Sequence, residues 1–284
     1  MKQLLALLLA AMAAVTSPLA TAQTGSPERK VLRLAFTRAE TSLDPARIVD
    51  LYSRNITAHI FESPLAFDYL ARPVKLRLLT AESMPEHSSD YRVWTIRVRP
   101  GVYFADDPAF KGKKRELVAA DYVYALKRIV DPKHKSPIVA SMIEEKFIGL
   151  AALRDEAVKG NKPFDYDKPI PGIAAPERYT LRFELEEPRP FFAESLAASD
   201  LWGAVAREVV EHYGDQIDGH PVGTGPFKLK TWRRSSEIVL ERNPDYREHL
   251  FDADPAPDDA VGQAILARHK GRRIPMVDEV RVAI

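Results

Sequence analysis

Residues 94–104 read Trp-Thr-Ile-Arg-Val-Arg-Pro-Gly-Val-Tyr-Phe and open with a strict alternation of apolar and polar side chains. Every second side chain from Trp94 to Val98 is apolar, so these side chains share one face of a strand and are expected to lie in the core. Pro100-Gly101 favours a turn, and Val102–Phe104 is expected to return as a short strand. The segment predicts a sheet with one buried face.

The chain on either side of this segment supplies further strands and one well-defined helix. Leu117–Val130 carries apolar residues at helical spacing, which predicts an amphipathic helix. Arg178–Glu186 alternates with period two and predicts a strand. Phe227–Trp232 and Glu237–Arg242 predict two successive antiparallel strands. Val31–Phe36 is mostly apolar on both faces and is expected to be buried within a sheet. The fold class expected is therefore α/β.

Composition excludes several classes of protein. With 284 residues, 45% hydrophobic and 29% charged, the chain suits a soluble globular protein rather than a disordered or membrane-embedded one. Removal of Lys2 would lower the net charge from +1 to zero, so the mature chain is not expected to attract nucleic acid or an anionic membrane. Stable membrane insertion is not expected either. The absence of cysteine excludes disulfides, a lipidated cysteine and a thiol nucleophile.

The first 22 residues have the pattern of a cleavable signal peptide. Lys2 precedes the apolar run Leu4–Val15, and Ala20-Thr21-Ala22 offers small residues to a signal peptidase. A transmembrane anchor is the alternative, but the run is far shorter than the ~20 residues needed to span a bilayer. The mature chain is expected to begin at Gln23, in the periplasm.

Seven short motifs occur in an order that resembles one protein family. They are Ser42–Pro45, Ile60–Leu65, Arg99–Phe104, Ala120–Ala125, Val222–Phe227, Arg242–Tyr246 and Pro275–Val280. Together they resemble family 5 of the bacterial extracellular solute-binding proteins, which serve the oligopeptide, dipeptide and nickel ABC importers. The resemblance covers nearly the whole mature chain.

The resemblance implies a periplasmic binding protein type II-like fold and a domain plan. The expected parts are a signal peptide (1–22), the start of lobe one (23–60), an extra subdomain (61–169), the rest of lobe one in part (170–246), an exposed insertion or linker (247–273) and a crossover strand toward the second lobe (274–284). The second lobe is expected to be missing. A truncated, frameshifted or split gene would explain this, and ligand binding by one wall alone is expected to be weak.

Candidate ligand-binding residues lie in the loop after the first strand: Thr37, Arg38, Ala39 and Glu40. Loops at the carboxyl ends of strands present ligand-binding groups in such sheets. Plain surface charge is the alternative for Arg38 and Glu40. Trp202 is a further candidate for lining the cleft, with core packing as its alternative.

The motif Gly223-Thr224-Gly225-Pro226 is expected to be structural and to lie near the cleft. Glycines permit a tight backbone, and proline fixes the direction in which the next strand starts. The Lys-Ser/Thr of a phosphate-binding loop is absent from it.

Binding, rather than catalysis, is the function that these features favour. The sequence contains no G-x-S-x-G, H-E-x-x-H or S-x-x-K motif, and its seven histidines are scattered. Neither a cofactor nor a metal is expected. By its resemblance the chain would be a monomer that captures peptides, or another small solute, for the transmembrane subunits of an ABC permease. The alternatives are a secreted hydrolase whose catalytic residues meet only in three dimensions, and a truncated non-functional product.

Overall fold

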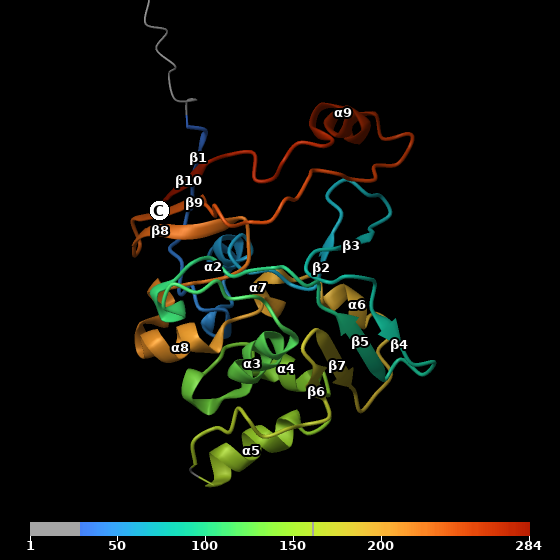
Figure 1. The fold of residues 1–284 in the computed structure, drawn as a ribbon, viewed down its shortest axis with the longest axis vertical. Coiled ribbons are helices and arrows are strands. Elements are labelled where there is room, and N and C mark those ends of the chain that lie inside the picture. Colours follow the sequence, from blue (N-terminus) through green and yellow to red (C-terminus); the bar gives the residue numbers. More distant parts are fainter. Residues whose placement is uncertain (1–28, 161) are drawn as a thin grey trace, which may run out of the picture.

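The structure is a computed structural model that describes residues 29–160 and 162–284. Three sheets and a set of mostly short helices make up this part of the chain (Figure 1). The predicted signal peptide, residues 1–22, lies outside the described residues. None of the helices in the described part is long and apolar enough to cross a membrane.

The first sheet joins the beginning of the described chain to its end. Its strand order is β1-β10-β9-β8, with β1 (Val31–Ala35) parallel to β10 (Glu279–Ala283). The remaining strands, β9 (Glu237–Arg242) and β8 (Phe227–Arg233), form the predicted antiparallel hairpin. Segments about 250 residues apart in sequence therefore become neighbours, as a mixed α/β fold requires.

The prediction that the first strand is buried within a sheet is wrong. β1 is an edge strand, and Leu32 and Leu34 are exposed. Both residues pair in register with Val280 and Val282 of β10, which are buried. Leu32 and Leu34 lie on the edge strand, where the apolar face of the sheet is exposed to solvent. An apolar sequence is therefore not enough to predict that a strand is buried.

The second large sheet has the order β4-β5-β7-β6 and is antiparallel throughout. Its strands are β4 (Glu86–His87), β5 (Val93–Arg97), β7 (Thr180–Glu184) and β6 (Ile173–Glu177). This arrangement corrects one expectation. Val102–Phe104 does not return along β5; it runs beside residues 115–117 and forms only an isolated bridge. The sheet joins strands from both sides of the boundary expected at residue 169, and that boundary stays a prediction.

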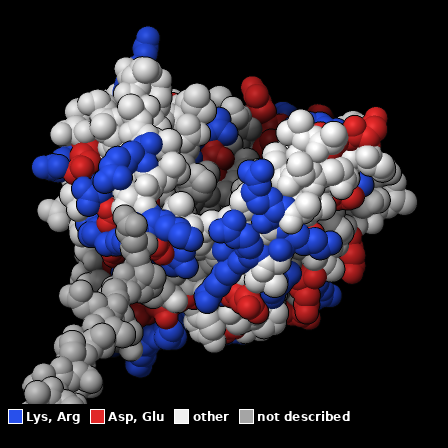
Figure 2. Space-filling model, turned by 90° about the horizontal axis from the view of Figure 1, so that it is seen from above, with Lys and Arg blue, Asp and Glu red and all other residues white. Residues whose placement is uncertain are grey.

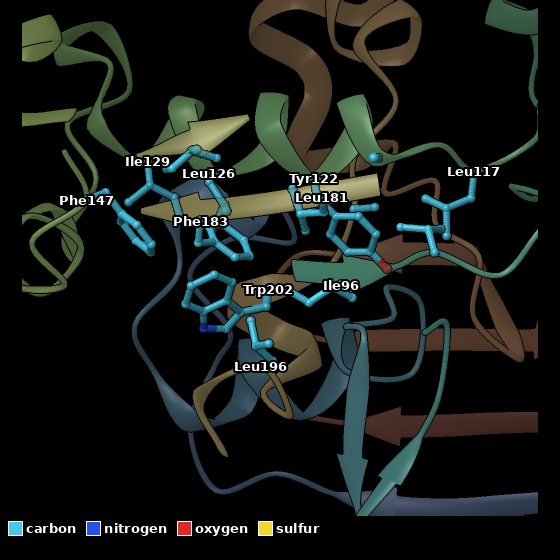
Figure 3. Packing of buried hydrophobic residues seen from close by; sticks show 14 of the residues in the cluster. Ile96, Leu117, Tyr122, Leu126, Ile129, Phe147, Leu181, Phe183, Leu196 and Trp202 are labelled. Carbon is cyan, nitrogen blue, oxygen red and sulfur yellow. The ribbon is translucent and has the colours of Figure 1, made fainter. Parts of the chain in front are cut away.

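The helix α3 (Ala119–Val130) packs against the second sheet and confirms the predicted helix. Its first turn is fixed by Asp121, whose carboxylate accepts a hydrogen bond from the Val118 backbone N–H at 2.8 Å. Tyr122, Leu126 and Ile129 point from α3 into the core beside Ile96 and Phe183 of the sheet (Figure 3). The predicted core face of the strand around Trp94 is likewise buried.

The remaining elements are short and fill the space around these sheets. They are α2 (Leu51–Thr57), β2 (Leu65–Phe67), β3 (Leu76–Leu78), α4 (Val139–Glu144), α5 (Leu150–Gly160), α6 (Phe192–Ser195), α7 (Ser199–Trp202), α8 (Arg207–Tyr213) and α9 (Ala260–His269). The stretch 247–273, expected as an insertion or linker, contains α9. It is fastened to the β2–β3 hairpin by Arg77, which donates to the Asp252 carbonyl at 2.7 Å.

Candidate functional site

The loop after β1 lies at the carboxyl end of that strand, beside the carboxyl end of the parallel strand β10. Thr37, Arg38 and Ala39 are exposed there, whereas Glu40 is only 4% exposed. Ligands bind preferentially outside the carboxyl ends of strands in open α/β sheets. The loop therefore occupies the edge where this sheet can present groups to a ligand.

Glu40 is held by the turn of the β8–β9 hairpin. Its Oε1 accepts hydrogen bonds from Trp232 Nε1 at 2.6 Å and from the Ser235 backbone N–H at 3.1 Å. The Arg234 guanidinium lies 4.8 Å from the centroid of the Trp232 ring. This contribution of the hairpin was not predicted from the sequence. The signal that could have found it is the turn between two adjacent predicted strands, which must return to the same sheet edge.

The N-terminus of α2 continues this surface. Thr37 Oγ1 lies 2.5 Å from the Tyr52 hydroxyl, and the Phe36 and Tyr52 rings are 4.9 Å apart. The loop and the helix are also joined by the Thr41 backbone N–H, which donates to Ser53 Oγ at 2.9 Å. These contacts place the loop after β1 next to the start of α2.

A small pocket opens on the other side of α2, between α2, α4 and α7. Its volume is about 230 Å³. Its lining residues are Val49, Arg54, Ile138, Ser141, Met142, Glu145, Leu201 and Trp202. Val49 is 57% exposed and nearby Leu51 is 65% exposed, so two apolar side chains close together in sequence face solvent. The pocket is mainly apolar, and the exposed Val49 is one of its lining residues.

Trp202 belongs both to this pocket and to the core. It is 5% exposed, and its ring lies 5.7 Å from that of Phe192 and 5.8 Å from that of Phe183 (Figure 3). Most of the indole surface therefore packs in the core, as the alternative interpretation expected. A ligand-lining role for the remaining surface stays a prediction.

The charged groups of the pocket are already paired within the protein. Arg54 is ion-paired with Asp200, and Glu145 lies 2.9 Å from Arg189. Burial raises the pKa of Glu145, and the Arg189 guanidinium opposes that rise. These pairs leave the pocket without a net charge of its own, which suits an uncharged apolar group.

A larger groove of about 610 Å³ runs between α3, β6 and α8. Two arginines brace its walls: Arg207 contacts Asp167 at 2.5 Å and Glu211 at 2.6 Å, and Arg115 contacts Asp121 at 2.6 Å and Glu208 at 2.8 Å. Both arginines are paired with carboxylates, and Lys127 donates to the carbonyls of Tyr166 and Lys168, so most charged groups of the groove already have partners within the protein.

The glycine motif packs directly against the backbone of residues 59–61. A Cβ atom on Gly223 would lie 2.0 Å from the Ile60 carbonyl oxygen, and one on Gly225 would lie 2.6 Å from the His59 carbonyl oxygen. The Gly225 N–H donates to the Ile60 carbonyl at 2.8 Å. Only glycine permits this approach, so the two glycines let the two backbone segments lie in direct contact. Its position near a cleft stays a prediction.

Three of the sequence motifs meet at the buried carboxylate of Glu62. Arg247 donates to both of its oxygens, at 2.7 and 3.0 Å. Thr224 Oγ1 and the Tyr246 hydroxyl add hydrogen bonds at 2.9 and 3.1 Å. Burial and the neighbouring Glu62 raise the pKa of Tyr246, so its hydroxyl remains a donor. This cluster joins the chain after α2, the glycine motif and the start of the 247–273 stretch.

Among the described residues, no group of three or more His, Asp and Glu side chains is placed to hold a metal ion. In the view from above, Lys and Arg side chains gather on both sides of a hollow, with acidic side chains interspersed (Figure 2). That face therefore carries charges of both signs.

Comparisons with known proteins agree on one family. The family model described as bacterial extracellular solute-binding proteins, family 5 Middle, matches residues 75–284. The periplasmic oligopeptide-binding protein OppA of Salmonella typhimurium is 31% identical over 207 residues, which are 72% of this chain and 34% of that protein. Di/tripeptide-binding protein 2 of Pseudomonas aeruginosa is 29% identical over 82% of this chain and 40% of its own length. The chain thus spans a third or slightly more of these relatives.

Solved structures show the same fold. Haemophilus influenzae OppA in complex with the peptide RPPGFSPFR has a TM-score of 0.67 and 21% identity, covering 90% of this chain and 42% of that one. The unliganded, open murein tripeptide-binding protein MppA has a TM-score of 0.65 at 21% identity over 90% of this chain and 41% of that one. The predicted α/β, periplasmic-binding-protein fold class is confirmed. The chain belongs to the bacterial extracellular solute-binding proteins of family 5.

Proposed function

We propose that the chain is a periplasmic substrate-binding component of an ABC importer and that it captures peptides on the surface around α2. That surface, the ligand wall, consists of the loop Thr37–Glu40, Tyr52, the apolar pair Val49 and Leu51, and the pocket of Trp202. The observation that carries the proposal is that α2 bears both parts of this wall, because Tyr52 contacts Thr37 of the loop and Arg54 lines the pocket. The names of the relatives, which are oligopeptide- and dipeptide-binding proteins, support peptides as the ligand class.

The ligand wall combines the two features that a peptide site needs. The loop and the hairpin turn offer backbone and hydroxyl groups, which can hydrogen-bond to the main chain of any peptide. The pocket of about 230 Å³ is large enough for one apolar side chain and carries no uncompensated charge. Burying such a side chain contributes about 1.5–3 kcal/mol, so we expect peptides with an apolar residue to bind more tightly than polar ones.

Calorimetry with residues 23–284 tests this function. We expect Ala-Phe-Ala to bind and Ala-Ser-Ala to bind at least tenfold more weakly. Val49→Asp should weaken Ala-Phe-Ala binding by a further tenfold or more, since it places a charge on the apolar wall. Val74→Asp is the matched control, because Val74 is also exposed and lies outside the wall. The proposal fails if the wild-type chain binds neither peptide or if both variants bind equally well.

The route to the periplasm and the partners are part of the same proposal. Export would remove residues 1–22 and leave a mature chain that begins at Gln23, as a monomer that delivers its ligand to the transmembrane permease subunits. The intact mass of the protein recovered from the periplasm tests the cleavage, and an uncleaved mass would contradict it.

A further inference from the structure

Buried carboxylates in this protein follow a rule with one exception. The structure describes seven Asp and Glu residues that are buried. Six of them have a basic side chain within 4 Å: Asp44, Glu62, Asp121, Asp131, Asp200 and Glu279. The seventh is Glu40, which has no Lys, Arg or His side chain within that distance anywhere in the described chain. Glu40 is thus the buried acid without a cationic partner.

The two oxygens of Glu40 have different surroundings. Oε1 accepts the hydrogen bonds from Trp232 and Ser235, whereas Oε2 is enclosed and has no partner. Three other buried side-chain atoms in the described part of the chain lack a partner, and all three are nitrogens, on Arg128, His134 and Arg242. The hairpin turn therefore holds one oxygen, and the other is enclosed without a partner in the described part of the chain.

A buried carboxylate that has only neutral N–H donors on one oxygen is costly to the unliganded fold. Buried charges are ordinarily paired, since desolvation penalises an isolated ion. A buried, unpaired charge at a ligand-binding edge can gain its oppositely charged partner from the ligand. Until the ligand binds, the unpaired charge lowers the stability of the protein. Glu40 lies at the carboxyl edge of the first sheet, next to the exposed residues Thr37–Ala39.

From these observations we infer that Glu40 accepts a cationic group of the ligand, an ammonium or a guanidinium, through Oε2. The inference rests on the proposed function and narrows it: the peptides preferred would present a positive charge at the loop end of the ligand wall. Because Oε2 is enclosed, the ligand's cation can reach it only if the surrounding atoms shift, and shifts of side chains and loops are common at binding surfaces. The cation could be the α-ammonium group or a basic side chain.

Three peptides separate the two sources of charge in calorimetry with residues 23–284. Ala-Phe-Ala has a free α-ammonium group, N-acetyl-Lys-Phe-Ala has only a side-chain cation, and N-acetyl-Ala-Phe-Ala has neither. We expect at least one of the first two to bind tenfold or more tightly than the third. Glu40→Gln keeps an acceptor for Trp232 and Ser235 but removes the charge. In this variant the ratio of the affinity for the tighter-binding cationic peptide to the affinity for N-acetyl-Ala-Phe-Ala should be close to one. Glu248→Gln, at an exposed glutamate outside the wall, removes the same charge and should leave the ratio unchanged.

Thermal unfolding without peptide provides a second test. If Glu40 serves a ligand, Glu40→Gln should melt no lower than the wild-type chain. A carboxylate that served the fold would instead lower the midpoint when replaced, and that result would overturn the inference. Equal affinity of the wild-type chain for all three peptides would also overturn it while leaving the proposed function intact. If none of the three peptides binds, the proposed function fails and the inference fails with it.

Discussion

Replacing Gly223 by alanine should destabilise the protein more than any other single-methyl change in the glycine motif. The new Cβ would lie 2.0 Å from the Ile60 carbonyl oxygen and 2.7 Å from its carbon, so the two backbone segments would have to separate by more than 1 Å. Overpacking of this kind costs roughly 1–3 kcal/mol. Separation would also lengthen the hydrogen bond from the Gly225 N–H to Ile60, which contributes about 1 kcal/mol. The expected loss of unfolding free energy is about 3 kcal/mol.

Thermal and urea unfolding, followed by circular dichroism, measure this loss. A change of about 3 kcal/mol corresponds to a fall in Tm of roughly 6–12 °C for a chain of this size. Gly219→Ala is the control, since a Cβ there meets no heavy atom within 4 Å and should change the stability by less than about 0.5 kcal/mol. If Gly223→Ala were as stable as this control, the close approach of the two segments would not be what the glycine is needed for.

Three further changes test other parts of the structure. Arg247→Gln should destabilise the chain by about 3–5 kcal/mol in urea unfolding, because it leaves the buried Glu62 carboxylate without its cation; a loss below 1 kcal/mol would show that the cluster tolerates an unpaired charge. Lys230 and Arg281 lower the pKa of Glu279 to about 2, below its value in the unfolded chain. The stability from Glu279 is therefore present above about pH 4 and lost as the pH falls toward 2, so Glu279→Gln should flatten the acid limb of a stability–pH curve, and an unchanged limb would contradict this. Trp202→Ala should cost about 3–5 kcal/mol in the same unfolding assay, since it leaves a cavity among three phenylalanine rings; a near-neutral result would mean that the indole serves the pocket rather than the core.

The sequence predicts the elements of this fold well where one periodicity dominates. The stripe on α3 and the alternation around Trp94 each specify a buried face, and both are buried in the structure. Burial of β1 was mispredicted because its apolar residues do not reveal whether a neighbouring element covers them. The pairing of β5 with β7 was not predicted, because it joins segments more than 80 residues apart and local patterns carry no information about such pairing.

The candidate site is predictable only in part, for a related reason. The loop Thr37–Glu40 follows a predicted strand, so its place at a sheet edge could be inferred from the chain order. The hydrogen bonds of Trp232 and Ser235 to Glu40 depend on the hairpin turn reaching the same edge across the sheet. The pocket at Trp202 needs three short helices to meet, and none of them is long enough to have a clear periodicity of its own.

The motifs that reveal the family are separate from the residues proposed to select the ligand. Glu62, Thr224, Tyr246 and Arg247 come from or directly follow three motifs, and they bond to one another rather than to any residue of the ligand wall. A motif of this kind is needed whatever ligand is bound, because it fixes how distant segments approach. Selectivity should therefore depend on residues outside the motifs, and a substitution at Glu40 or Val49 should change which peptides bind while leaving the fold intact. Substitutions in the Glu62 cluster should do the reverse: they should lower stability and leave the order of peptide preference unchanged in whatever protein remains folded.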